Sequence, residues 1–336
     1  MSRHAEADPT LAHRYGPRWR GHWVDDLHTR LLMLAQAVAF NRAELFTANV
    51  GWSRAAFHAR EVGPDDLRNS VNAMRAVLAD ELPEAAAAPA LACVDAALAG
   101  PLESPAPTLA PPPAVSPDLP HGRLALRYLE ALLEGDRRRA EGLVLEAAAS
   151  AAVSVADLYL HVLAPAMTEV GNMWHMNEIT VADEHFAMMV TESLMARLRP
   201  YFPDVPATGH TMIATSISGD QHALGVRMVA DFFEMAGWNA VCLGASTPAD
   251  DVLEYLAHRD ADLLAVSVTN PLFLRALAEL IETIRAIDNL AHTPVMVGGG
   301  PFLAIPDLWR DVGADGSARS AREAVEIAAR LVTPSG

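Results

Sequence analysis

Four short apolar runs in the last third of the chain restrict its fold more than any other feature. They are rich in β-branched residues and cover residues 211–217, 239–244, 262–269 and 293–299. Stretches of helical periodicity separate the runs, and this alternation is typical of a parallel sheet built from βαβ units. We therefore expect residues 208–334 to form a flavodoxin-like or Rossmann-like α/β domain, with its binding site at the carboxyl ends of the strands.

The residues before this domain favour helices. In residues 1–100 the apolar positions recur at a spacing of three and four, which predicts an all-helical N-terminal domain. Residues 101–120 hold eight prolines, so we expect an extended linker rather than a helix or a strand. Residues 121–204 return to helical spacing and predict a four-helix bundle. The predicted fold class is therefore an all-α region followed by an α/β domain.

The charged residues exclude several functions. All 25 basic residues are arginine, which excludes a P-loop lysine, a Schiff-base lysine and a kinase-type lysine. The net charge is −17, although the first 60 residues hold eight arginines against five acidic residues. A body this acidic repels phosphate backbones, so we expect no direct binding to nucleic acid.

Cysteine content and hydropathy indicate the compartment. The two cysteines, Cys93 and Cys242, lie far apart in the sequence, which suits a reducing cytoplasm. No apolar run reaches the roughly 18 residues that a membrane span requires. The first 23 residues lack the apolar core of a signal peptide. We expect a cytoplasmic protein that does not contact a membrane.

A short motif after the first apolar run carries the clearest chemistry. It reads Asp-x-His-x-x-Gly and consists of Asp220, His222 and Gly225. An aspartate two residues from a histidine can fix the tautomer of the imidazole and raise its basicity toward a metal. The glycine lets the following helix approach whatever the loop holds. The motif is weak by itself, because chains of this length contain it by chance.

Residues at the ends of two other runs strengthen the motif. Ser267 and Thr269 end the third run, and Gly298 and Gly299 end the fourth. All three loops would lie at one edge of one sheet. Hydroxyl groups and bare glycine backbone there favour a slot for a large, flat, nucleotide-like tail.

This combination resembles the cobalamin-binding domain of methionine synthase, cobalamin mutases and corrinoid proteins, over residues 208–334. The resemblance implies that His222 coordinates cobalt from below, in place of the dimethylbenzimidazole, and that Asp220 is its partner. The residues that would line the slot for the displaced tail are Ser267, Thr269, Gly298 and Gly299. Thr269 departs from the leucine usual in the family, for which we expect only a local change.

A second motif lies in the helical region before this domain. A tryptophan and, after nine further residues, Glu-His resemble the light-sensing cobalamin proteins of the CarH and LitR type, in which the bundle caps the upper face of the corrin. The resemblance implies that Trp174 shields the adenosyl group of adenosylcobalamin and that Val181 is a further matching residue of the cap. It implies that Glu184 binds the adenosyl ribose beside His185. It also matches His175 to the histidine that takes the upper cobalt position after light breaks the Co–C bond.

The N-terminal region departs from that family. Such repressors begin with a basic helix-turn-helix domain, and residues 1–100 show no such motif. An all-helical domain, a proline-rich linker and the capped cobalamin domain are more similar to photocobilins. This resemblance implies a bound bilin, biliverdin, near the cobalamin. The alternative is a helical domain for dimerisation or signalling, and analogy with the family also raises a homo-oligomer as an expectation.

We therefore expect a light sensor rather than an enzyme. In this interpretation, photolysis of the Co–C bond of adenosylcobalamin rearranges the bundle and the N-terminal domain and signals to a downstream protein of unknown identity. One alternative is a corrinoid methyl-carrier protein of a methyltransferase system. Another is a cobalamin-sensing regulator that does not respond to light.

Overall fold

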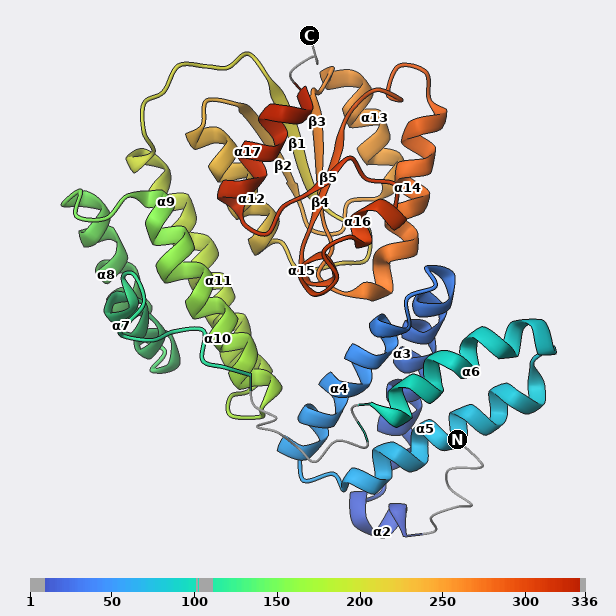
Figure 1. Cartoon of the computed structure of the whole chain (residues 1–336). Coiled ribbons are helices and arrows are strands. Elements are labelled where there is room, and N and C mark those ends of the chain that lie inside the picture. Colours follow the sequence, from blue (N-terminus) through green and yellow to red (C-terminus); the bar gives the residue numbers. More distant parts are fainter. Residues whose placement is uncertain (1–9, 101, 103–110, 333–336) are drawn as a thin grey trace. The chain divides into compact units, whose positions relative to one another are not determined.

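The computed structural model describes residues 10–100, 102 and 111–332. It divides into two compact units (Figure 1). The helical unit comprises Met1–Pro112 and Asn172–Ile179, and the main unit comprises Pro113–Gly171 and Thr180–Gly336. Much of the predicted linker, namely residue 101 and residues 103–110, lies outside the described residues. The four-part division inferred from the sequence stays a prediction.

The helical unit confirms the helices expected before the linker. Its helices in chain order are α2 (Leu11–Tyr15), α3 (Trp19–Ala39), α4 (Ala43–Ala59), α5 (Pro64–Glu81) and α6 (Glu84–Ala99). The fixed φ of Pro64 suits the first turn of α5, where its missing N–H costs no hydrogen bond. Leu11, Trp19 and Trp23 are buried together and pack α2 against α3.

The main unit begins with a helical bundle. Its elements are α7 (Gly122–Leu133), α8 (Arg137–Ala149), α9 (Val155–Leu158), a π-helical turn η1 (Tyr159–Leu163), α10 (Ala164–His175), α11 (Val181–Leu198) and η2 (Arg199–Tyr201). The last residues of α10, from Asn172, belong to the helical unit. Helix α11 begins with a capping box, in which Thr180 and Asp183 bind each other's backbone N–H groups.

The second part of the main unit is the predicted parallel α/β domain. Its strands are β1 (Thr211–Ser216), β2 (Asn239–Gly244), β3 (Leu263–Ser267), β4 (Val295–Gly298) and β5 (Gly316–Ser317). All pairings are parallel and the strand order is β2-β1-β3-β4-β5. The intervening elements are α12 (Leu224–Met235), α13 (Ala249–Arg259), η3 (Pro271–Phe273), α14 (Leu274–Ala286), α15 (Gly300–Ala304) and α16 (Leu308–Asp311), and α17 (Ala321–Val332) follows β5.

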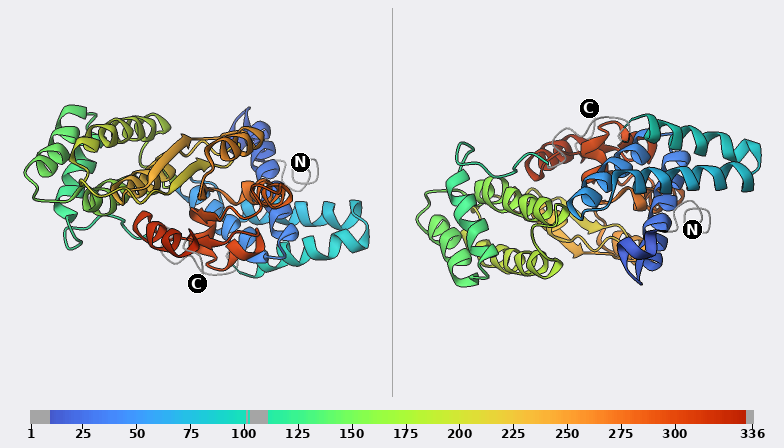
Figure 2. Two further views of the ribbon diagram at one scale, coloured as in Figure 1. Left: turned by 90° about the horizontal axis from the view of Figure 1, so that it is seen from above. Right: turned by 90° about the horizontal axis from the view of Figure 1, so that it is seen from below.

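Helices cover both faces of this sheet. Figure 1 shows α12 and α17 on one face and α13 and α14 on the other. On the first face, Met212 and Ala214 of β1 are fully buried in one cluster with Phe233 of α12 and Ala328 of α17. Because alternate residues of a strand face opposite sides, a sheet covered on both faces requires the unbroken apolar runs found in the sequence. The two views in Figure 2 show the bundle helices, coloured green to yellow, beside the sheet.

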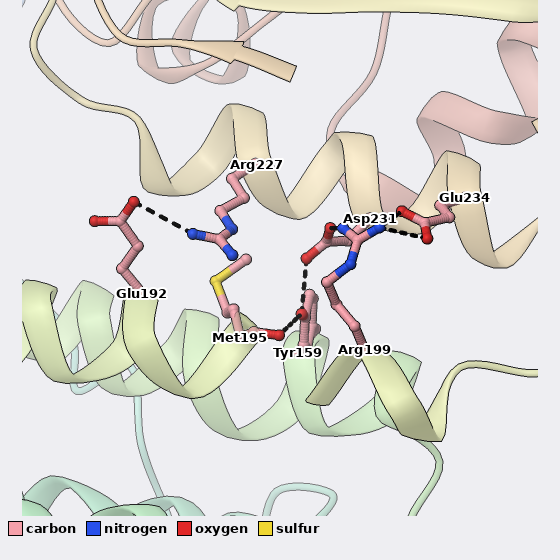
Figure 3. A network of polar contacts seen from close by, with 7 residues as sticks. All are labelled: Tyr159, Glu192, Met195, Arg199, Arg227, Asp231 and Glu234. Carbon is pink, nitrogen blue, oxygen red and sulfur yellow. Dashed lines mark hydrogen bonds and ion pairs between the residues drawn. The ribbon is translucent and has the colours of Figure 1, made fainter. Parts of the chain in front are cut away.

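A buried polar network joins the bundle to α12 (Figure 3). The carboxylate of Asp231 is 3% exposed and accepts a hydrogen bond of 2.8 Å from the Tyr159 hydroxyl. Arg199 lies 3.3 Å from the same carboxylate and also pairs with Glu234. Tyr159 and Asp231, the buried polar side chains of this network, therefore both have partners, as a stable interior requires.

Candidate functional site

Asp220 and His222 form a hydrogen-bonded pair on the loop between β1 and α12. The Nδ1 atom of His222 lies 2.7 Å from Oδ1 of Asp220, and the same oxygen accepts the backbone N–H of His222 at 3.1 Å. Because an ionised carboxylate only accepts hydrogen bonds, Nδ1 carries a proton, and in the neutral imidazole Nε2 carries the lone pair. The carboxylate is buried, whereas the imidazole is 61% exposed. The pair therefore presents one nitrogen ligand to solvent, in a fixed orientation.

The pKa values of the two groups shift in opposite directions. The hydrogen bond with Asp220 and the charges of Asp220 and Glu184 raise the pKa of His222, although burial opposes the increase. Burial acts against the ionised form of Asp220, but hydrogen bonds from the His222 ring and from the backbone N–H groups of Thr269 and His222 outweigh it and lower the pKa of this carboxyl. A carboxylate at Nδ1 makes Nε2 a stronger metal ligand.

The loops after β3 and β4 complete this edge of the sheet. The backbone N–H of Thr269 donates to Oδ2 of Asp220 at 2.6 Å. Ser267 pairs in register with Gly298, the last residue of β4. Gly299 has a φ of 111°, and a Cβ there would lie 2.1 Å from the carbonyl oxygen of Val268. Only glycine fits this close approach, so the structure brings the predicted slot residues together with the Asp220–His222 pair.

Gly225 is the second residue of α12 and lies directly after this loop. A Cβ built on Gly225 would meet no atom within 4 Å, and its backbone is in an ordinary helical conformation. Nothing in the protein itself thus requires a glycine at this position. Open space beside the loop is what close approach of a bound molecule to the helix would require.

Two further serines hold the loop, and sequence reasoning missed both. The hydroxyl of Ser216 donates to the backbone carbonyl of His222 at 2.7 Å, and the hydroxyl of Ser246 accepts the N–H of Gly219 at 2.9 Å. A serine at the end of a strand is ordinary, and no pattern in the chain links Ser246 to a loop from which α12 and β2 separate it. No sequence signal could have found them.

The first turn of α11 carries the other predicted residues of the main unit. Glu184 is close enough for its charge to contribute to the raised pKa of His222. The imidazole of His185 lies 3.6 Å from the Glu184 carboxylate, and its side chain is 67% exposed. Val181 is also half exposed. The start of α11 therefore presents a carboxylate, an imidazole and an apolar side chain that the protein leaves partly uncovered.

Trp174 and His175 belong to an aromatic cluster in the helical unit. The ring of His175 stacks on Trp52 with centroids 4.3 Å apart, and its Nε2 lies 3.0 Å from the Trp52 carbonyl oxygen. Trp174 lies 6.3 Å from the same indole, and Arg60 donates to the carbonyls of both residues at the end of α10. Burial and the charge of Arg60 lower the pKa of His175, although the Trp52 hydrogen bond opposes this. The face of the His175 ring and its Nε2 atom therefore both contact the protein.

Comparison with known proteins shows which domains the main unit resembles. Two models, each described as a B12 binding domain, match residues 124–199 and 210–328. A corrinoid protein of Desulfitobacterium hafniense (strain Y51) is 27% identical over 214 residues, which cover 60% of this chain and 94% of that protein. Dimethylamine corrinoid protein 3 of Methanosarcina acetivorans is 26% identical over 175 residues, 51% of this chain and 79% of that protein.

A solved structure shows the same fold. The monomethylamine corrinoid protein of Methanosarcina barkeri superposes with a TM-score of 0.56 at 22% identity, over 63% of this chain and all of that one. With the two domain matches, these findings show a corrinoid-binding protein with a cobalamin-binding α/β domain. In the part of the chain that the structure describes, no helix is long and apolar enough to cross a membrane.

The residues present fit a corrinoid. One exposed imidazole nitrogen is the single ligand that suits cobalt already held in a macrocycle, because imidazole is a good cobalt ligand. The glycine backbone at Gly299 and the register of Ser267 with Gly298 leave the edge of the sheet without large side chains. Both observations fit a corrinoid that His222 would hold through Nε2 and that the glycine-lined edge of the sheet would admit.

Proposed function

We propose that the chain is a corrinoid carrier, in which His222 ligates cobalt and a partner methyltransferase loads or removes a methyl group. Cobalt in such a cofactor supplies a centre that accepts and releases a methyl group. The chain itself holds and orients the cofactor, and the enzymatic step belongs to the partner. The curated relatives, which are named as corrinoid proteins, support this function over the alternatives.

The observation that carries the proposal is the Asp220–His222 pair. Its Nδ1 atom is bound at 2.7 Å and its ring is 61% exposed, so Nε2 is free to ligate a metal and cannot rotate away without breaking that bond. With Nδ1 bound to Asp220, His222 would hold cobalt through Nε2, whose basicity the carboxylate would raise.

The first test is the ligand itself. The purified full chain is loaded with hydroxocobalamin and compared with His222→Ala, Asp220→Asn and the control His258→Ala, which removes an exposed imidazole on α13. We expect His222→Ala to lose the histidine-bound absorption spectrum and Asp220→Asn to bind about 10- to 100-fold more weakly. The control is expected to match the wild-type protein. Wild-type binding that survives His222→Ala unchanged would refute the proposal.

A second candidate is the light sensor predicted from the Trp174 motif. One observation favours it: Trp174 and His175 contact Trp52 of α4 and Arg60, the residue that follows this helix, and both lie outside the two matched domain models. Because all four residues belong to the helical unit, a change at Trp174 or His175 would alter contacts of α4 within that unit. In this candidate the cofactor is adenosylcobalamin, and the output goes to a signalling partner rather than to a methyltransferase.

Corrinoid preference separates the two candidates. Affinities for adenosylcobalamin and methylcobalamin are measured in the dark with the wild-type protein and Trp174→Ala. A carrier is expected to bind both forms within a few-fold, with no loss of preference in the variant. A sensor is expected to prefer adenosylcobalamin, to lose that preference in Trp174→Ala, and to change its absorption spectrum permanently after green light. Biliverdin belongs to the sensor candidate only, and titration that yields no far-red band would remove it.

A further inference from the structure

Two serine hydroxyls from outside the loop hold the segment that carries His222. Ser216, the last residue of β1, is fully buried and donates to the carbonyl oxygen of His222 at 2.7 Å. Among the described residues, no other donor reaches that carbonyl. If the Ser216 hydroxyl were removed, a partly buried carbonyl would lose its partner, and the loop would shift to recover one.

Ser246 holds the other end of the loop from a neighbouring strand. It follows β2, has a φ of 52°, and its hydroxyl accepts the N–H of Gly219 at 2.9 Å. A residue other than glycine in this left-handed conformation is held there by its surroundings. Thr247, next to it, is anchored by a hydrogen bond of 2.9 Å to Thr215 of β1.

Gly219 leaves the loop little room to move. Its φ is 91°, and a Cβ at this position would lie 2.8 Å from the ring of Phe273 in η3. The backbone between Gly219 and His222 is thus fixed on one side by Ser246 and Phe273 and on the other by Ser216. Asp220 lies between these two anchors, so they hold the backbone from which its carboxylate and the His222 imidazole project, while the N–H of Thr269 binds the carboxylate itself.

We propose that Ser216 and Ser246 are positioning residues that set the distance and angle at which the His222 imidazole reaches cobalt. Asp220 fixes the rotation and tautomer of the ring, whereas the two serines fix the backbone from which the ring projects. Partners of this kind determine the strength of a metal–histidine bond although they do not touch the metal. The inference rests on the proposed ligation of cobalt by His222.

The test measures cobalt ligation directly. Full-length protein labelled with ¹⁵N-histidine is loaded with cobalamin, reduced to Co(II), and studied by electron paramagnetic resonance, in which a bound histidine nitrogen splits the signal. The variants are Ser216→Ala, Ser246→Ala and the double variant. The control is Ser218→Ala, because Ser218 is exposed in the same loop and its hydroxyl has no partner within the described part of the chain.

Loss of one hydrogen bond predicts that the ratio of histidine-bound to histidine-free cobalt falls about 3- to 10-fold in each single variant. The double variant is expected to fall further, and the control to match the wild-type protein. Ser246 is only partly buried, so Ser246→Ala decides the question if Ser216→Ala does not fold. Wild-type splitting that both single variants retain in full would overturn this inference alone. Absence of histidine splitting in the wild-type protein would overturn the proposed function as well.

Discussion

The Tyr159–Asp231 contact in Figure 3 allows a quantitative prediction. Tyr159→Phe removes a donor 2.8 Å from a carboxylate that is only 3% exposed. A hydrogen bond to a charged group contributes about 1.5–3 kcal/mol. Because Arg199 at 3.3 Å still faces the carboxylate, we expect a loss near the middle of that range, about 2 kcal/mol.

The same substitution elsewhere in the bundle provides the control. Tyr128 is also fully buried, but its hydroxyl lies 2.8 Å from the hydroxyl of Thr191, which carries no charge. Tyr128→Phe is expected to cost about 1 kcal/mol, the net value of a neutral hydrogen bond. The measurement is hydrogen exchange of the backbone amides of α12, which reports the opening of the main unit separately from the helical unit.

The pH dependence distinguishes the charged contact from the neutral one. Burial raises the pKa of Asp231, and the hydrogen bond from Tyr159 lowers it. A carboxyl with a raised folded-state pKa contributes stability that is fully present below its unfolded pKa and is lost as the pH rises through the folded value. Tyr159→Phe raises that pKa further, so its cost should grow from about pH 4 to neutral pH. Equal costs for the two variants, or a Tyr159→Phe cost independent of pH, would refute this reasoning.

Three other substitutions test features of the site. In Gly225→Ala the added Cβ would meet no atom within 4 Å. The variant should therefore stabilise the corrinoid-free protein by up to about 1 kcal/mol but weaken the binding of hydroxocobalamin. Thermal unfolding with and without the ligand measures both effects. Gly299→Ala would place a Cβ 2.1 Å from the Val268 carbonyl oxygen at a φ of 111°, and a drop in the melting temperature equivalent to at least about 2 kcal/mol is expected; an unchanged melting temperature would contradict the close approach. Trp52→Ala should raise the pKa of His175 toward its ordinary value of about 6.5, because burial lowers it, and an unchanged NMR titration would show that the stack is not the cause.

The sequence predicted the fold well where a segment's own pattern decides its structure. The β-branched runs became β1 to β4 because strands buried on both faces need apolar residues at every position. The strand β5, Gly316–Ser317, has no such pattern and exists only through its pairing with Met296 and Val297 of β4. Two residues without a hydrophobic signature cannot be recognised before the neighbouring strand is in place.

The site residues also fall into those that a local sequence pattern reveals and those that depend on contacts between distant segments. The contact between Asp220 and His222 could be predicted from the sequence because residues two positions apart on one loop are necessarily close in space. The contact of Trp52 with His175 joins residues that are 123 positions apart, and no local pattern encodes it. The role that the family resemblance implied for His175, and the roles of Trp174 and Glu184, stay predictions that the corrinoid experiments must decide.

The strand order has a consequence that does not depend on any side chain. The chain leaves β1 toward α12 on one face of the sheet and leaves β3, the neighbouring strand, toward α14 on the other. Two adjacent connections that diverge open a crevice between them, and such a crevice at a topological switch point is where open α/β sheets bind their ligands. The backbone therefore selects the location, and the loop residues select only the chemistry. The same architecture could be redesigned for another planar cofactor by exchanging a few side chains at this crevice.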